Sequence, residues 1–291
     1  MRLSTLLPLT WLLGLGSSFA AEEHHALPLN AQRVHEALPV VTNSMLMVWI
    51  AVGVIVLFCQ LATRKVSLIP SGFQNFAEWL IESLYDFLGG LLGAHLVKRV
   101  FWFLGSIFFF ILVTNWLGLI PGVGTIGLED SHGHLVPFLR GGNADLNMTS
   151  AMAFTFATLW FYWAVTENGV RGFFAHIFAP KGDFKGFMVV LMVPIFFLVG
   201  LLEIVSIAVR PVALSFRLFG NIYGGEQTLE ALMNLIPKSL QLYLSWLPAL
   251  PFYFMELLVG AVQALVFTLL CAIFIKLICD HGDEHHDEAH H

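Results

Sequence analysis

The sequence predicts an all-α polytopic membrane protein that ends in a long, steeply tilted helical hairpin. Of its 291 residues, 57% are hydrophobic and only 12% are charged, which excludes an ordinary soluble domain. Several apolar stretches are long enough to cross a hydrocarbon core about 30 Å thick. Arg217 lies deep inside the longest of them. Because arginine stays protonated, we expect this charge to have a function in the membrane.

The first residues have the features of a secretory leader. Arg2 is followed by a short apolar core, LLPLTWLLGLG, and by the small-residue motif Ser18-Phe19-Ala20. This pattern predicts a cleaved signal peptide over residues 1–20, and an uncleaved first membrane helix is the alternative. In both cases we expect the polar segment 21–44 outside the cytoplasm, before a membrane domain over residues 45–279.

The first apolar stretch, residues 45–62, is long enough to span the membrane. It ends at Arg64-Lys65, and the positive-inside rule places that end in the cytoplasm. Over residues 68–97 apolar side chains recur at helical spacing among carboxylates and amides, which predicts an amphipathic helix at the cytoplasmic interface. A second span follows over residues 101–120.

The next segments continue the alternation across the membrane. A polar, Gly-rich loop over residues 122–147 is expected outside, and a further span covers residues 148–166. The following loop contains three basic residues, which predicts a cytoplasmic position: Arg171, Lys181 and Lys185. The acidic, His-rich tail, residues 280–291, is also expected in the cytoplasm, with the N-terminus outside.

The apolar stretch from Phe187 to Met233 is too long for one perpendicular span. As a helix rising 1.5 Å per residue it would be about 70 Å long, more than twice the hydrocarbon thickness. Pro194 and Pro211 can kink a helix, but no polar turn divides the stretch. A Pro-rich turn over residues 236–251 leads to a last apolar stretch, 252–278. We therefore expect a tilted hairpin of two long helices.

Three charged residues of the hairpin are spaced seven apart: Glu203, Arg210 and Arg217. This spacing places them on nearly one stripe of a helix. Seven residues correspond to about 10.5 Å of rise, which we take as too long for salt bridges between neighbours on the stripe.

Polar residues on the two hairpin helices are predicted to meet. Asn221 shares the face of Arg217, and Glu256 and Gln263, again seven apart, share a face of the last helix. Antiparallel packing brings Gln263 towards Arg217 and leaves Glu226 and Glu256 nearer the outside. No carboxylate is obviously positioned to neutralise Arg217, which indicates a partner carboxylate on another subunit. The alternative is an ion-pair network that only holds helices together.

Four motifs resemble subunit a of F-type ATP synthases. RPVALSFRLFGNIYGGE, residues 210–226, resembles the signature of that family. TNWLGLIPG at 114–122, ADLNMTSAMA at 144–153 and the spacing of Glu256 and Gln263 match the family in the same order. Together with the hairpin, the resemblance covers nearly the whole chain after the leader.

The resemblance implies a proton-translocating stator subunit with two offset half-channels. Arg217 matches the arginine that faces the carboxylates of the c-subunit ring, and Gln263 matches the glutamine that helps to orient it. Arg210 falls at a basic position for which we expect a structural role, and Asp145 in a stretch expected to cap a helix. The remaining matches are half-channel residues: Asn115, Asn221, Glu226 and Glu256 at the outer one, and Glu203 near the cytoplasmic one.

The resemblance also implies partners and a location. The partners are the c ring, the peripheral-stalk b subunits, the remainder of the F1Fo complex and the lipid bilayer, in a bacterial inner membrane. The sequence shows no nucleotide-binding loop, metal-ligand spacing or basic stripe for nucleic acid, so we expect no cofactor and ATP chemistry only in other subunits. The alternative is an H⁺- or Na⁺-coupled secondary transporter using Glu203, Arg217 and Glu256. Such folds usually contain internal repeats, and the arginine motif has no second copy.

Overall fold

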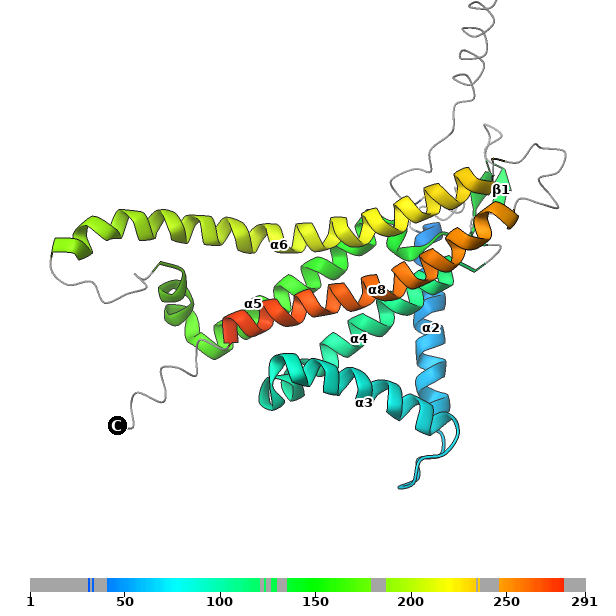
Figure 1. The fold of residues 1–291 in the computed structure, drawn as a ribbon, viewed down its shortest axis with the longest axis horizontal. Coiled ribbons are helices and arrows are strands. Elements are labelled where there is room, and N and C mark those ends of the chain that lie inside the picture. Colours follow the sequence, from blue (N-terminus) through cyan, green and yellow to red (C-terminus); the bar gives the residue numbers. More distant parts are fainter. Residues whose placement is uncertain are drawn as a thin grey trace, which may run out of the picture.

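The computed structural model describes residues 31, 33, 41–120, 123, 127–129, 135–178, 187–233, 235 and 246–279. The predicted leader, the loop with Lys181 and Lys185 and the His-rich tail lie outside the described residues. Within them the chain folds into long helices and one small sheet (Figure 1). The helices are α2 (Asn43–Thr63), α3 (Phe73–Leu92), α4 (Ala94–Gly118), α5 (Leu146–Phe178), α6 (Phe187–Met233) and α8 (Trp246–Cys279).

The predicted fold class is confirmed. Four of the described helices are long and apolar enough to cross a membrane: α2, α4, α6 from Pro194 and α8 from Leu247. α5, which we predicted as a further span, is not among these four, and its crossing of the membrane stays a prediction. Phe156 and Trp160 of α5 are buried, whereas Phe154 and Phe161 are exposed.

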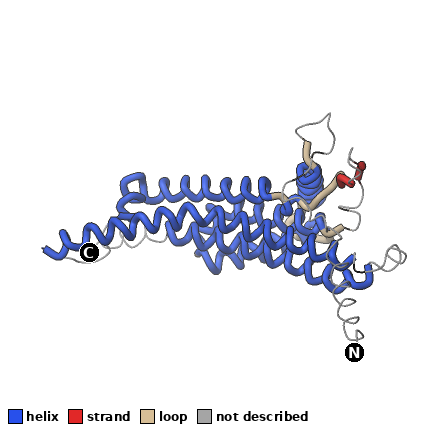
Figure 2. Tube along the Cα trace, turned by 90° about the horizontal axis from the view of Figure 1, so that it is seen from above, coloured by secondary structure: helices blue, strands red, loops and turns tan. Residues whose placement is uncertain are grey.

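The helical hairpin forms as one continuous helix followed by another. α6 extends over 47 residues with Pro194 and Pro211 inside it, so no loop interrupts the apolar stretch. α5, α6 and α8 pack together lengthwise, while α2 runs crosswise to them and is seen nearly end-on in Figure 2. The hairpin helices are therefore steeply inclined to the first span, as their length required.

The end of α5 and the start of α8 differ from the prediction. α5 continues past residue 166 and kinks at Gly169, whose φ of 66° suits glycine, so Arg171 lies in a helix and not in a loop. α8 begins at Trp246, six residues before the predicted start at 252, and includes Pro251. Its other proline, Pro248, lies in the first turn, where no backbone N–H is needed for a helical hydrogen bond.

The amphipathic helix is confirmed as α3. Ala77, Leu84 and Leu88 are buried, whereas Glu82 and Asp86 are exposed. α3 passes into α4 at Gly93, which adopts a φ of 84°, open to glycine because it has no Cβ. Lys276 Nζ on α8 donates a hydrogen bond to the Leu91 carbonyl at 2.9 Å. Leu91 lies at the C-terminal end of α3, where the helix dipole stabilises a positive charge.

Parts of the segment between α4 and α5, which we predicted as a loop, form regular secondary structure. Strands β1 (Gly127–Glu129) and β2 (Leu135–Pro137) pair antiparallel, and a 3₁₀ turn, η1, covers Gly142–Ala144. Three-residue strands are too short to give an alternating pattern, so the sequence carried no signal for them.

Asp145 caps α5, as predicted. Its Oδ1 accepts from the Asn147 backbone N–H at 3.0 Å, and its backbone carbonyl accepts from the Thr149 N–H at 3.2 Å. Its Oδ2 accepts from the Ser44 hydroxyl at 2.8 Å, which ties α5 to the start of α2. One carboxylate thus serves both the helix end and a contact between helices.

Replacing Asp145 tests whether its side chain stabilises the start of α5. Asp145→Ala is expected to lower stability by about 0.5–2 kcal/mol, the usual effect of losing such a cap. The measurement is the midpoint temperature of aggregation of the full chain in detergent. Asp145→Asn is the control, because an amide oxygen still accepts from the Asn147 N–H. A midpoint unchanged by Asp145→Ala would contradict the capping role.

Candidate functional site

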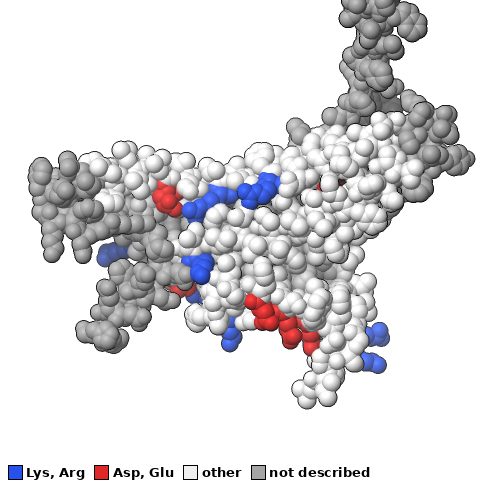
Figure 3. Space-filling model, in the orientation of Figure 1, with Lys and Arg blue, Asp and Glu red and all other residues white. Residues whose placement is uncertain are grey.

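The predicted site residues fall into three groups along α6 and the helices packed against it. Arg217 of α6 is the central group. Glu203 and Arg210 precede Arg217 by up to four helical turns, and the outer carboxylates, Glu226 of α6 and Glu256 of α8, lie beyond it. On the face shown in Figure 3, the charged side chains of α6 stand in a broad uncharged surface. Charged side chains are therefore sparse on this face of α6.

Arg217 is exposed on α6, whereas the adjacent Leu218 and the earlier Leu214 are buried. Among the described residues, Arg217 takes part in no hydrogen bond or ion pair. Gly220 and Gly224 are also exposed, and a Cβ on either would meet nothing within 4 Å. We call Arg217, Gly220 and Gly224 the Arg217 face.

Gln263 contacts Asn221 and not Arg217. The Asn221 side-chain amide donates to the Gln263 Oε1 at 2.7 Å, and Gln263 is only 4% exposed. The expected approach of Gln263 to Arg217 is therefore not a hydrogen bond in this structure. Packing of α8 against α6 sets Gln263 level with the residue one helical turn beyond the arginine.

Glu203 and Arg210 form an ion pair, which corrects the expectation that their spacing was too long. Arg210 Nη2 lies 3.2 Å from Glu203 Oε1. Helical side chains lean towards the N-terminus, so the long arginine reaches back along the stripe to the carboxylate. The Arg210 guanidinium also lies 4.8 Å from the ring centroid of Phe274 on α8. Its charge is thus balanced within the chain, consistent with the structural role that we expected.

Glu226 is held by the loop that follows β2. Its Oε1 accepts from the Gly141 N–H at 3.3 Å, and its Oε2 lies 3.5 Å from Arg140 Nε, an ion pair longer than a good hydrogen bond. Arg140 is only 4% exposed, and its guanidinium lies 5.9 Å from the Tyr223 ring centroid. Sequence patterns alone did not single out Arg140. The one sequence signal was the adjacent glycine pair, because a Cβ on Gly141 would come within 2.8 Å of Glu226 Oε1.

Glu256 is inserted between helices opposite a glycine. It is 5% exposed, and its Oε1 is buried without a hydrogen-bond partner among the described residues. A Cβ on Gly225 of α6 would overlap the Glu256 carboxylate. The glycine therefore makes room for a carboxylate that comes from α8.

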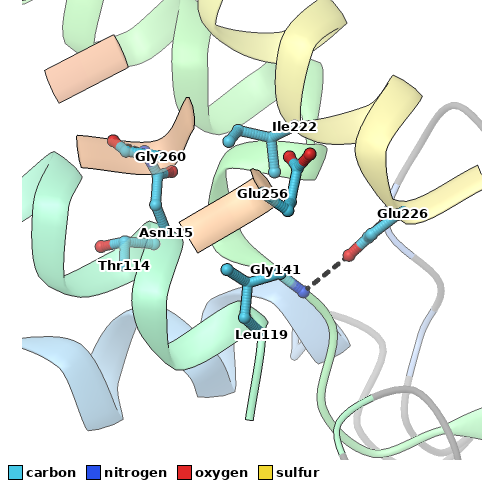
Figure 4. Close-up of a pocket in the computed structure, with 9 residues that line it drawn as sticks. Thr114, Asn115, Leu119, Gly141, Ile222, Glu226, Glu256 and Gly260 are labelled. Carbon is cyan, nitrogen blue, oxygen red and sulfur yellow. Dashed lines mark hydrogen bonds between the residues drawn. The ribbon is translucent and has the colours of Figure 1, made fainter. Parts of the chain in front are cut away.

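Asn115 joins three elements beside these carboxylates. Its Nδ2 donates to the Gly260 carbonyl of α8 at 2.9 Å, and its Oδ1 accepts from Asn143 of η1 at 2.7 Å. Figure 4 shows Asn115, Glu226 and Glu256 around a cavity of about 20 Å³, enough for one water molecule. The structure thus brings three of the four predicted outer residues together from three separate helices, whereas Asn221 does not line this cavity.

The described residues contain no group of three or more His, Cys, Asp or Glu side chains that could hold a metal ion. The polar side chains of the site are carboxylates, amides and arginines. These groups can hold charge, accept protons and order water.

The contact between Gly225 and Glu256 gives a matched pair of variants. Gly225→Ala is expected to lower the aggregation midpoint of the full chain in detergent, because overpacking a tight contact costs about 1–3 kcal/mol. Gly224→Ala is the control, since its added Cβ meets nothing within 4 Å. Equal midpoints for the two variants would show that the Glu256 carboxylate moves away without cost.

Comparisons with known proteins cover the whole of this site. The family described as ATP synthase A chain matches residues 45–276. The ATP synthase subunit a of Solidesulfovibrio magneticus is 31% identical over 243 residues, which cover 84% of this chain and 87% of that protein. The family match includes α6, α8 up to residue 276 and every residue of the candidate site. This chain therefore belongs to the ATP synthase A chain family and has its role in the membrane-embedded Fo sector of an ATP synthase.

Proposed function

We propose that this chain is the proton-translocating stator subunit of a rotary ATP synthase, with Arg217 as the fixed charge that faces the carboxylates of a c-subunit ring. The observation that carries the proposal is the state of Arg217. It is exposed on a membrane helix and has no hydrogen bond or ion pair with any described residue.

An arginine in this position needs a partner from outside the chain. A charged side chain near the bilayer centre costs about 2.5–3.5 kcal/mol on insertion scales. Arginine cannot avoid this cost by releasing its proton. A carboxylate on a neighbouring subunit removes the cost by pairing with it, and the fixed cation in turn favours the ionised form of that carboxylate. A ring site therefore releases its proton as it approaches Arg217, which acts as an electrostatic gate and not as a relay.

The rest of the Arg217 face supports a helical partner. Gly220 and Gly224 are four residues apart, the spacing at which small residues let two membrane helices approach closely. No other described part of the chain lies within 4 Å of the Cβ positions of these glycines. Their small size is therefore available to a helix of another subunit.

The other polar groups lie on both sides of Arg217, as offset half-channels require. Glu203 and Glu226 are separated by 23 residues, about 35 Å of helix at 1.5 Å per residue. The outer group contains Asn115, Glu226 and Glu256 around a cavity, with Asn221 and Gln263 between it and the arginine. The distribution of Lys and Arg places the Glu203 end towards the cytoplasm, with the N-terminus outside.

The proposal assigns the remaining work to partners. The c ring carries the exchangeable proton, the b subunits of the peripheral stalk hold the stator, and ATP chemistry takes place in other subunits of the F1Fo complex. A secondary transporter, the alternative, would move ions without a ring.

Neutralising Arg217 tests the gate. In inverted membrane vesicles, Arg217→Ala is expected to abolish ATP-driven proton pumping, because no fixed cation remains to discharge the ring carboxylates. Arg210→Ala is the matched control, since Arg210 lies on the same stripe but is paired with Glu203 within the chain. We expect the control to retain a measurable part of the pumping rate. Co-purification of the c ring checks that both complexes assemble.

Full pumping by an assembled Arg217→Ala complex would contradict the gate assignment. Equal loss of pumping in the two variants would show that the stripe as a whole, and not Arg217 alone, is required. Proton-coupled transport by the purified chain without a c ring would favour the transporter.

A further inference from the structure

We propose that Arg140 is a positioning residue for proton entry: it holds Glu226 against the outer loop by an ion pair and leaves Glu256 as the carboxylate at the cavity that has no cation partner among the described residues. This inference rests on the proposed function, because it concerns the path by which protons reach the ring. It assigns distinct roles to two carboxylates that the sequence treats alike.

Arg140 is buried between the outer segment and α6. Its side chain is 4% exposed, although it belongs to the segment between β2 and η1 that connects α4 and α5. A buried guanidinium is unfavourable unless an opposite charge lies close to it. Glu226 supplies that charge at 3.5 Å, and the Tyr223 ring, one turn earlier on α6, lies 5.9 Å from the guanidinium carbon. Arg140 thus connects the outer segment to α6.

Glu226 is restrained by contacts with the outer segment. Its Oε1 accepts a hydrogen bond from the Gly141 N–H, and its Oε2 lies 3.5 Å from Arg140 Nε in an ion pair without a hydrogen bond. Arg140 therefore offsets the negative charge of Glu226, and losing it would release the Glu226 side chain and leave that carboxylate without its cation.

Glu256 differs from Glu226 in its partners. This carboxylate lines the same cavity of about 20 Å³, but among the described residues no cation pairs with it. Its Oε1 is buried and has no hydrogen-bond partner among them. A cavity of this size holds one water molecule, which needs polar partners. The geometry assigns to Glu256 the exchange of a proton with that water, and to Glu226 a fixed position beside it (Figure 4).

The test compares charge with shape at residue 140 in the intact F1Fo complex. Arg140→Gln is expected to lower ATP-driven pumping in inverted vesicles at least about tenfold, since one partner of a buried ion pair is left alone. Arg140→Lys restores a positive charge and is expected to pump faster than Arg140→Gln, because a lysine ammonium also pairs with a carboxylate. A residue that only fills space would not be rescued by charge.

A double variant shows whether Arg140 acts through Glu226. The amount of assembled complex is measured by co-purification for Arg140→Gln, Glu226→Gln and both together. We expect the double variant to assemble as well as Glu226→Gln alone, because removing both charges leaves neither unpaired. Arg140→Gln that fails to assemble but is rescued by Glu226→Gln also supports the proposal.

Three results would overturn it: normal pumping by Arg140→Gln, an Arg140→Lys variant as defective as Arg140→Gln, or failed assembly that Glu226→Gln does not rescue. Arg217→Ala in the same vesicles separates this inference from the proposed function. Normal pumping by Arg217→Ala defeats the proposed function, whatever residue 140 does. Loss in Arg217→Ala with normal pumping in Arg140→Gln defeats only the role of Arg140.

Discussion

The constraint on which this structure depends is the free-energy cost of placing permanent positive charge in a slab of hydrocarbon. Arginine cannot discharge itself there, so each arginine in or beside the long helices needs an opposite charge or an aromatic face. Arg99, Arg140 and Arg210 have such partners within the described residues, whereas Arg217, on the apolar part of α6, has none among them. That difference separates the arginines that hold elements together from the arginine for which we propose a partner on another subunit.

The paired arginines connect elements. Arg210 links Glu203 to Phe274 on α8, and Arg140 links the outer segment to Glu226 on α6. Arg99 of α4 pairs in the same way with Glu167 of α5. These contacts fix how the helices lie around Arg217, which is itself exposed and has no ion pair among the described residues. The internal pairs therefore hold together the helices around Arg217 and leave its charge without a partner among the described residues.

The glycines of α6 follow the same division between inside and outside. Gly225 faces α8 and leaves space for the Glu256 carboxylate, whereas Gly220 and Gly224 face open space. One glycine thus serves a contact within the chain, and its neighbours leave room for a helix from another subunit. Adjacent residues of the same type have different roles because a helix turns by about 100° per residue, which points them towards different surroundings.

The sequence by itself determined the all-α membrane fold, the uninterrupted α6, the cap at Asp145 and the position of Arg217 on α6. These follow from apolar length, local capping chemistry and helical period, which depend only on residues close in the chain. Only the tertiary structure decided that Gln263 meets Asn221, that Arg140 pairs with Glu226 and that Gly225 faces Glu256. Helical spacing states which residues share a face, but the register of one helix on another is set by how their side chains interlock. Even the contact between Glu203 and Arg210 on one helix needed the side-chain direction, because rise along the axis says nothing about how far a long arginine reaches back.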